Sequence, residues 1–168
     1  LERSITQSAA QILEGISVLK KIKDINIGEN LNSEKILSEY QIIEPNKSNK
    51  DLHQVYSSLK RLIFLNNKDE NLYTVELDIQ KRFDDIDIRE DEKVTRMGIS
   101  TIVFFKIRKK NSDIILFTGK SIGSNAFNRL EEPYSNEIAK NDSVSKLNAT
   151  IALDIRNQLA LFSKKLKN

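Results

Sequence analysis

Between residues 73 and 79 the chain alternates strictly between apolar and polar side chains. The apolar set is Tyr73, Val75, Leu77 and Ile79, and each intervening residue is polar or acidic. A period of two is typical of a β-strand with one buried face, because successive side chains point to opposite sides of the sheet. The pattern therefore predicts a strand whose sheet is covered by helices on one face only.

Two further strands are predicted to follow as an antiparallel hairpin. The first is entered at Val94-Thr95-Arg96, and its sheet-forming part is residues 97–107. The second covers residues 114–118, and Asn111-Ser112-Asp113 is the turn between them. After Ile122-Gly123-Ser124-Asn125 we expect a loop that ends at Pro133. Upstream, residues 40–44 form a short apolar run closed by Pro45, which is typical of an edge strand that ends in a turn.

Two amphipathic helices are predicted from apolar positions that recur every three or four residues. Residues 52–65 form the first, and Asn49 or Asp51 is placed to accept the free amide hydrogens of its first turn. Residues 143–162 form a closing helix, which we expect Asn141-Asp142-Ser143 to interrupt near its start. Its apolar stripe comprises Val144, Leu147, Ile151, Ile155, Leu159, Phe162 and Leu166.

The N-terminal part is more polar and divides the chain. Residues 4–22 are interpreted as a helix, although Ile16-Ser17-Val18 could instead start a strand. We thus expect an N-terminal helical and polar segment at residues 1–39 and an α+β domain at residues 40–168. The predicted fold class is a two-layer α+β sandwich, with about four mostly antiparallel strands covered on one face by two helices, plus the N-terminal helical segment.

Composition narrows the class without identifying a function. The chain has 168 residues, and its 27 Lys and Arg against 24 Asp and Glu give a net charge of +3, which is too weak to indicate a nucleic-acid partner. Cysteine is absent, which excludes disulfides and zinc–thiolate sites. The start Leu1-Glu2-Arg3-Ser4 lacks the apolar core of a signal peptide.

Catalytic and metal motifs are weak throughout, so we expect no enzyme, cofactor or metal site. His53 is interpreted as a surface or boundary residue, since the chain has no cysteine or second histidine to share a metal; without a Gly-x-Ser-x-Gly sequence, a catalytic triad is improbable as well. The acidic run at residues 84–92 lacks the glycine of an EF-hand loop and favours a solvated strand or hairpin arm. Gly119-Lys120-Ser121 matches the end of a P-loop, but the P-loop also needs a glycine at position 114, where this chain has Ile. We therefore predict that Gly119 ends a strand and that Lys120 faces solvent.

The most suggestive cluster is basic and lies on the second predicted strand. Lys106, Arg108 and Lys110 share one strand face with Ile102 and Phe104. Cations beside apolar groups suit the binding of an anionic amphiphile. The alternative is that these long side chains only keep the end of the hairpin solvated, with their stems covering apolar surface and their charged ends in water. Binding of RNA by the sheet face is disfavoured, because the stacking aromatics and glycines of an RRM module are not visible.

Several of these patterns together resemble the LptE family of lipopolysaccharide-assembly lipoproteins, in its alphaproteobacterial form. The resemblance rests on Tyr73-x-Val75-x-Leu77, Val94-Thr95-Arg96, the segment 124–128 read as a loop before Pro133-Tyr134-Ser135, and Ala152-Leu153-Asp154-Ile155-Arg156. It spans about residues 40–162, and the polar segment before Tyr40 is longer than the family pattern.

The resemblance implies a non-enzymatic outer-membrane lipoprotein on the periplasmic side, which plugs the LptD barrel and binds lipopolysaccharide. Membrane contact would come from a lipid anchor that this sequence lacks. By charge and expected exposure, the candidates for contacting lipopolysaccharide phosphates are Arg96, Lys106, Arg108 and Lys120. The alternative is a periplasmic accessory or chaperone-like domain that binds only protein, within a transport or secretion system. A signal peptide and a lipidated cysteine at the start of the gene would favour an envelope protein over a cytoplasmic chaperone.

Overall fold

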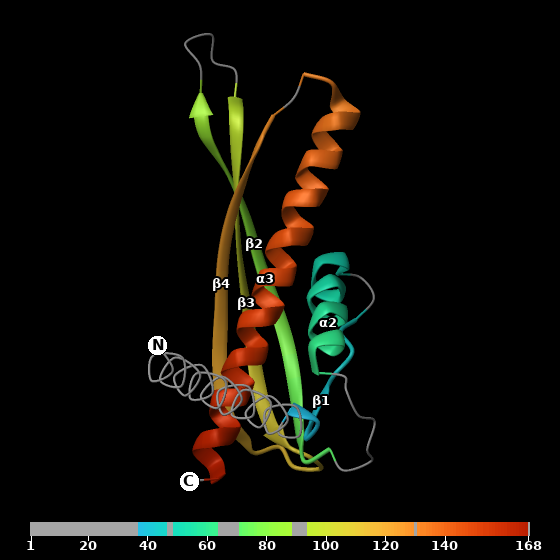
Figure 1. The fold of residues 1–168 in the computed structure, drawn as a ribbon, viewed down its shortest axis with the longest axis vertical. Coiled ribbons are helices and arrows are strands. Elements are labelled where there is room, and N and C mark those ends of the chain that lie inside the picture. The colour runs from blue at the N-terminus through green and yellow to red at the C-terminus, as the bar shows by residue number, and fades with distance from the viewer. Residues whose placement is uncertain (1–36, 47–48, 64–70, 89–93, 130, 168) are drawn as a thin grey trace, which may run out of the picture. The chain divides into compact units, whose positions relative to one another are not determined.

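The computed structural model describes residues 37–46, 49–63, 71–88, 94–129 and 131–167. The elements in chain order are β1 (Tyr40–Ile42), α2 (Lys50–Ile63), β2 (Tyr73–Ile88), β3 (Val94–Lys109), β4 (Ile115–Asn128) and α3 (Pro133–Lys167) (Figure 1). The predicted helix at residues 4–22 lies outside the described residues, and so does its alternative strand at Ile16-Ser17-Val18. The division between residues 39 and 40 stays a prediction.

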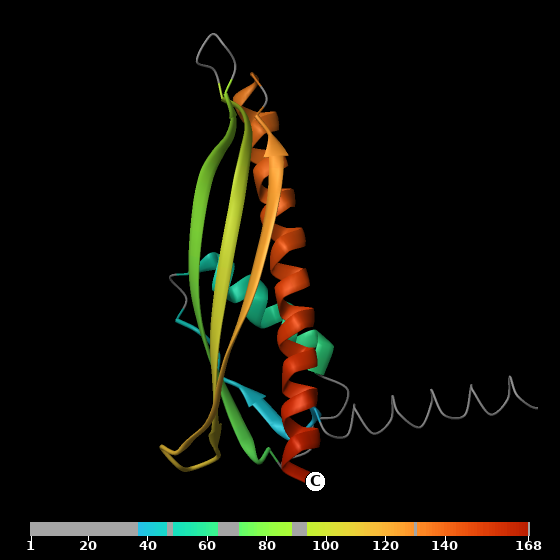
Figure 2. The same cartoon turned by 90° about the vertical axis from the view of Figure 1, so that its left-hand side faces the viewer.

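The strands form one four-stranded sheet in the order β1-β2-β3-β4. Strand β1 runs parallel to β2, and β2, β3 and β4 pair antiparallel through two hairpins. Helices α2 and α3 lie on the same side of β2, β3 and β4 (Figure 2). The predicted two-layer α+β sandwich is therefore confirmed, including the short edge strand that begins at Tyr40.

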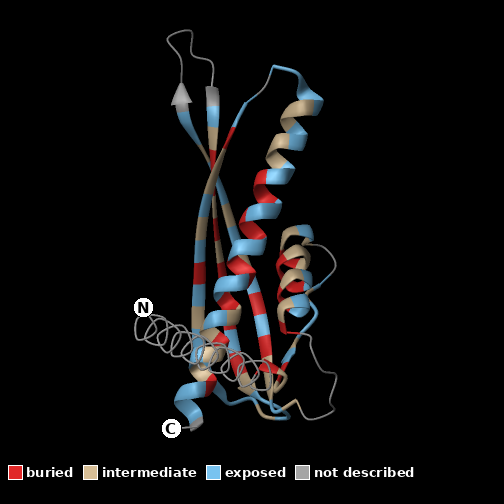
Figure 3. Ribbon diagram, viewed as in Figure 1, coloured by how far each residue is buried: buried red, intermediate tan, exposed pale blue. Residues whose placement is uncertain are grey.

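The core lies between the sheet and the two helices. Along β3, Val103, Phe105 and Ile107 are buried while their neighbours are more exposed, as expected for a strand with one covered face. Helix α3 faces them with Ile151, Ile155 and Leu159, and α2 contributes Val55 and Leu59. The buried positions form stripes on the facing sides of the helices and strands (Figure 3).

Side chains cap both helices at their N-termini. The backbone amide of Leu52 donates a hydrogen bond of 3.1 Å to Asn49 Oδ1, so Asn49 is the cap expected for α2. The Glu132 carboxylate accepts the backbone amides of Tyr134 at 3.1 Å and Ser135 at 2.6 Å. Hydrogen bonds from the Ser135 side chain and then from these amides hold the Glu132 pKa below its ordinary value.

Tyr40 ties the edge strand to the closing helix. Its hydroxyl donates a hydrogen bond of 3.2 Å to the carbonyl of Leu159 and also lies in hydrogen-bond contact with the Ser163 hydroxyl. Burial is the main cause that raises the Tyr40 pKa to about 12, and the bond to Ser163 partly opposes it. The phenol is therefore strongly favoured in its neutral form.

Four sequence predictions in the C-terminal half are wrong, and two of them concern strand β4. Residues 124–128 belong to strand β4 and not to a loop, because Asn125 and Phe127 pair with Ile99 and Met97 of β3. Gly119 lies inside that strand and does not end it.

Helix α3 continues through residues 141–143, where the sequence predicted an interruption. An ion pair of 2.7 Å between Lys146 and Asp142, and a hydrogen bond of 3.2 Å from Asn141 to Glu137, support the helix there. Leu166 was assigned to the buried stripe of this helix but is largely exposed.

Candidate functional site

The sheet face opposite the helices, here called the open face, is free of any other described element. It carries the even-numbered positions of β3 and β4, because Lys106 pairs with Thr118 and Phe104 pairs with Lys120. Arg96 and Arg108 occupy even positions of β3 too. All four residues predicted to contact phosphate therefore lie on the open face.

The structure brings three of these four residues together. Lys120 is the diagonal cross-strand neighbour of Lys106, at a typical separation of about 7–8 Å. Arg108 follows Lys106 on the same face of β3. Arg96 lies ten positions before Lys106 in that strand, so the two residues are roughly 33 Å apart at about 3.3 Å per residue. One ligand headgroup cannot contact Arg96 and Lys106 together.

A shallow hollow opens beside Lys106. Its volume is about 460 Å³, and residues from three neighbouring strands line it: Glu76, Leu77, Asp78, Phe104, Phe105, Lys106, Thr118 and Gly119. Phe104 is half-buried and gives the hollow an apolar wall, while Lys106 is exposed at its edge. The hollow can thus hold an apolar group while a cation contacts an attached anion.

Gly119 has a structural reason to be glycine at this point. A Cβ atom built there would overlap the ring of Phe105, which is almost fully buried and is its cross-strand partner. Gly119 thus gives the Phe105 ring the space that a side chain would occupy.

The cations of the open face differ in their availability. Arg108 forms ion pairs with Glu76 at 3.2 Å and with Asp113 at 3.8 Å, so two carboxylates already compete for it. No described carboxylate lies within 4.0 Å of the ammonium groups of Lys106 or Lys120. Within the cluster of three, Lys106 and Lys120 are therefore better able than Arg108 to meet an external anion.

Sequence reasoning missed one contributor to this surface. Ile122 is 59% exposed, and it lies on the open face opposite Ile102. It extends the apolar strip that begins at Phe104. The signal that would have revealed it is the continued strand, since extending the predicted strand 114–118 by a few residues places Ile122 beside Ile102.

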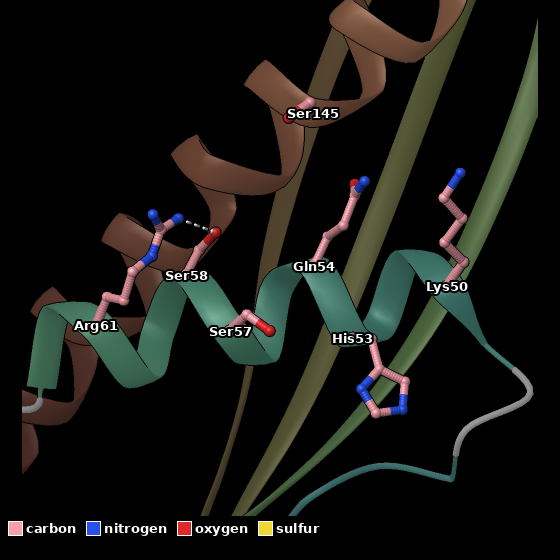
Figure 4. A pocket seen from close by; sticks show the side chains of 7 residues that line it. All are labelled: Lys50, His53, Gln54, Ser57, Ser58, Arg61 and Ser145. Atoms are coloured by element: carbon pink, nitrogen blue, oxygen red, sulfur yellow. Dashed lines mark hydrogen bonds between the residues drawn. The ribbon is translucent and has the colours of Figure 1, made fainter.

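A second hollow, of about 320 Å³, lies beside helix α2 and includes His53 (Figure 4). It is lined by Lys50, His53, Gln54, Ser57, Ser58, Arg61 and Ser145. In Figure 4 the imidazole of His53 points away from Gln54 and Lys50. His53 instead packs edge-on against Tyr56, with the ring centroids 6.2 Å apart. His53 is partly buried, in agreement with its interpretation as a boundary residue.

Neither hollow holds a recognisable metal centre. Within the described ranges, no three His, Asp or Glu residues are grouped so that they could bind a metal ion. Residues 84–88, which include Asp84, Asp85 and Asp87, belong to β2, as expected for a hairpin arm, and residues 89–92 lie outside the described ranges. None of the described helices is long and apolar enough to cross a bilayer.

Comparison with known proteins identifies the fold but no sequence family. No family profile matches the sequence, and no curated protein matches it significantly. A protein from Caulobacter crescentus CB15, named as a candidate lipoprotein, superposes with a TM-score of 0.64 at 14% identity, over 80% of this chain and 97% of that one.

Two further solved structures superpose over similar lengths. Rare lipoprotein B from Shewanella oneidensis gives a TM-score of 0.59 at 9% identity, over 77% of this chain and 98% of its own. A minor lipoprotein from Acinetobacter baumannii gives 0.53 at 14% identity, over 73% and 88%. At these identities the likeness establishes a shared fold, and that fold is one found in bacterial lipoproteins.

Proposed function

We propose that this chain is the folded domain of a non-enzymatic outer-membrane lipoprotein of the LptE type, which acts in lipopolysaccharide assembly. The observation that carries the proposal is the shared fold: nearly the whole of rare lipoprotein B, a name used for LptE, superposes on this chain. The resemblance in the sequence patterns points to the same family. In this proposal the full-length protein is lipid-anchored on the periplasmic side of the outer membrane and plugs the LptD barrel.

The open face would provide the contact with lipopolysaccharide. Lys106 and Lys120 carry the charges that attract phosphate, and an ammonium group in contact with phosphate makes a charge-assisted hydrogen bond. Phe104 and Ile122 supply apolar surface on the same face for the acyl part of the ligand. Glu76 and Asp78 border the hollow and would repel phosphate, so the ligand is confined to the β3 and β4 side.

This arrangement predicts weak and salt-sensitive binding. Exposed ion pairs contribute about 0.2–1 kcal/mol each, and salt screens them beyond about 8 Å at physiological ionic strength. In this proposal the open face binds the ligand and carries out no reaction on it. The ligand should leave the protein unmodified.

The test is a lipopolysaccharide-binding titration at low and physiological salt. Lys106→Glu combined with Lys120→Glu should lower the affinity by roughly tenfold or more, from the loss of two attractive contacts and the gain of repulsion. A double control, Lys50→Glu with Arg156→Glu, makes the same charge change on helices α2 and α3, away from the open face, and should lose much less affinity.

Arg96→Glu is the informative third variant, because Arg96 lies on the open face but far from Lys106. It should bind nearly as well as the original chain. If all three variants lose affinity equally, binding follows net charge and the open-face site is wrong. If the chain fails to bind lipopolysaccharide and captures only an unrelated protein, the accessory-domain alternative replaces this proposal.

A further inference from the structure

The turn between β3 and β4 leads into four consecutive exposed apolar residues. Ile114, Ile115, Leu116 and Phe117 are 65%, 47%, 37% and 36% exposed. Consecutive exposed apolar side chains are unusual on a folded domain, and a contiguous apolar patch usually marks an interaction surface. We call residues 114–116 the hairpin tip, because Phe117 is partly covered by a neighbour.

That neighbour is the C-terminal end of α3. The rings of Phe117 and Phe162 stack with their centroids 5.1 Å apart, so the last turns of α3 lie next to the residue that directly follows the hairpin tip. These turns add two exposed leucines, Leu161 and Leu166, to the apolar surface of this end of the domain. Figure 1 shows the β3–β4 turn and the C-terminal end of α3 at the same end of the domain, so the exposed apolar residues of both lie at that end.

Basic residues surround this apolar surface. Lys109 and Lys110 directly precede the turn, Lys164 and Lys165 lie in the last turns of α3, and all four are exposed. None of them forms an ion pair with a described carboxylate. The nearest acid in the turn, Asp113, already lies 3.8 Å from Arg108. Uncompensated positive charge therefore borders the exposed tip.

This combination argues against a second copy as the occupant. Two chains that meet through their tips would bring both sets of lysines together, and like charges repel. An anionic bilayer surface fits both features, since apolar side chains enter the boundary between headgroups and acyl chains while the ammonium groups contact lipid phosphates.

We propose that the hairpin tip and the C-terminal end of α3 form a docking surface for an anionic lipid bilayer. It acts independently of the open-face site for lipopolysaccharide. The surface gives the domain a membrane contact of its own, and each lysine near a negatively charged leaflet strengthens it. Because the tip lies at one end of the long sheet, docking there leaves the rest of the open face accessible.

Flotation of the full chain with lipid vesicles tests this proposal. The vesicles contain either equal parts of phosphatidylglycerol and phosphatidylcholine or phosphatidylcholine alone, without lipopolysaccharide. The chain should float with the anionic vesicles at low salt, at least tenfold less with the neutral ones, and less with the anionic ones as salt rises.

Two variants separate the apolar and the electrostatic contributions. Ile114→Ser with Ile115→Ser removes exposed apolar surface and keeps every charge, whereas Lys109→Glu with Lys110→Glu keeps the apolar surface and reverses the charge. Each pair should lower binding to anionic vesicles at least tenfold with unchanged thermal stability. Leu153→Ser, at a residue 47% exposed on α3 away from the tip, and Arg156→Glu on the same helix are the controls that should bind normally.

The outcomes distinguish the two proposals. Loss of vesicle binding in the tip variants, with lipopolysaccharide binding retained, supports a separate docking surface. The proposal is overturned if both tip variants float as well as the original chain, or if Arg156→Glu reduces flotation as much as they do. It is also overturned if the original chain forms a dimer that Ile115→Ser abolishes, since a second copy would then cover the tip.

Discussion

Truncation of Ile155 to alanine tests whether the closing helix packs on the sheet as described. Ile155 is fully buried at the centre of the α3 stripe and belongs to the core shared by the sheet and both helices. Removing its outer carbons costs the transfer free energy of those atoms plus the free energy of the cavity that remains, together about 2–5 kcal/mol. For a chain of 168 residues, a loss of about 3 kcal/mol lowers the Tm by roughly 6–12 °C.

Two control variants use the same substitution at positions that should matter less. Leu153→Ala lies two residues away on α3, where the side chain is about half exposed, and should cost about 1 kcal/mol or less. His53→Ala should be near neutral, because the enclosed Nε2 atom of His53 has no hydrogen-bond partner among the described residues and its removal breaks no bond. Urea unfolding monitored by circular dichroism measures all three. Equal losses for Ile155→Ala and Leu153→Ala would refute the packing of α3.

Two more predictions concern single side chains in the core. Gly119→Val should lower the free energy of unfolding by about 1–3 kcal/mol, since its side chain overlaps the buried ring of Phe105; a variant as stable as the original in urea would show that the ring can move aside. Tyr40 has a folded-state pKa of about 12, above the ordinary value of about 10, so its contribution to stability is complete below pH 10 and is lost as the pH rises toward 12. Unfolding midpoints between pH 9 and 12 should therefore fall more steeply for the original chain than for Tyr40→Phe, and identical slopes would contradict the burial of the phenol.

The sheet was largely predictable from the sequence where a strand has one buried face. Val75 and Leu77 on β2 alternate with polar neighbours, and Ile107 on β3 lies between two basic residues, so local pattern and final burial agree there. The second half of β4 has no such pattern. Ser121 is buried there, and Gly123 lies against Leu147 and Ile151 of α3. Small residues let a helix pack close to the sheet, but in the sequence alone they resemble a loop. The strand is recognised only once the position of the helix is known.

The sequence was enough to predict which sheet face carries the candidate site, but not which of its cations are paired with carboxylates. Counting positions along β3 was enough to place Phe104, Lys106 and Arg108 on one side. The ion pair between Arg108 and Glu76 depends on cross-strand register, and a slip of one residue would move Glu76 to the opposite face. Register follows from the packing of the whole sheet, so the reduced availability of Arg108 emerged only with the structure.

Co-purification with the LptD barrel of the same organism tests the central proposal most directly. The chain, extended by its native anchor segment, is co-expressed with the barrel, extracted in detergent and isolated through a tag on the chain alone. The account predicts that the barrel is recovered in equal amount and that the complex withstands high salt, because a plug is held by more than exposed charges. Recovery of the folded chain without the barrel would contradict the assignment to lipopolysaccharide assembly.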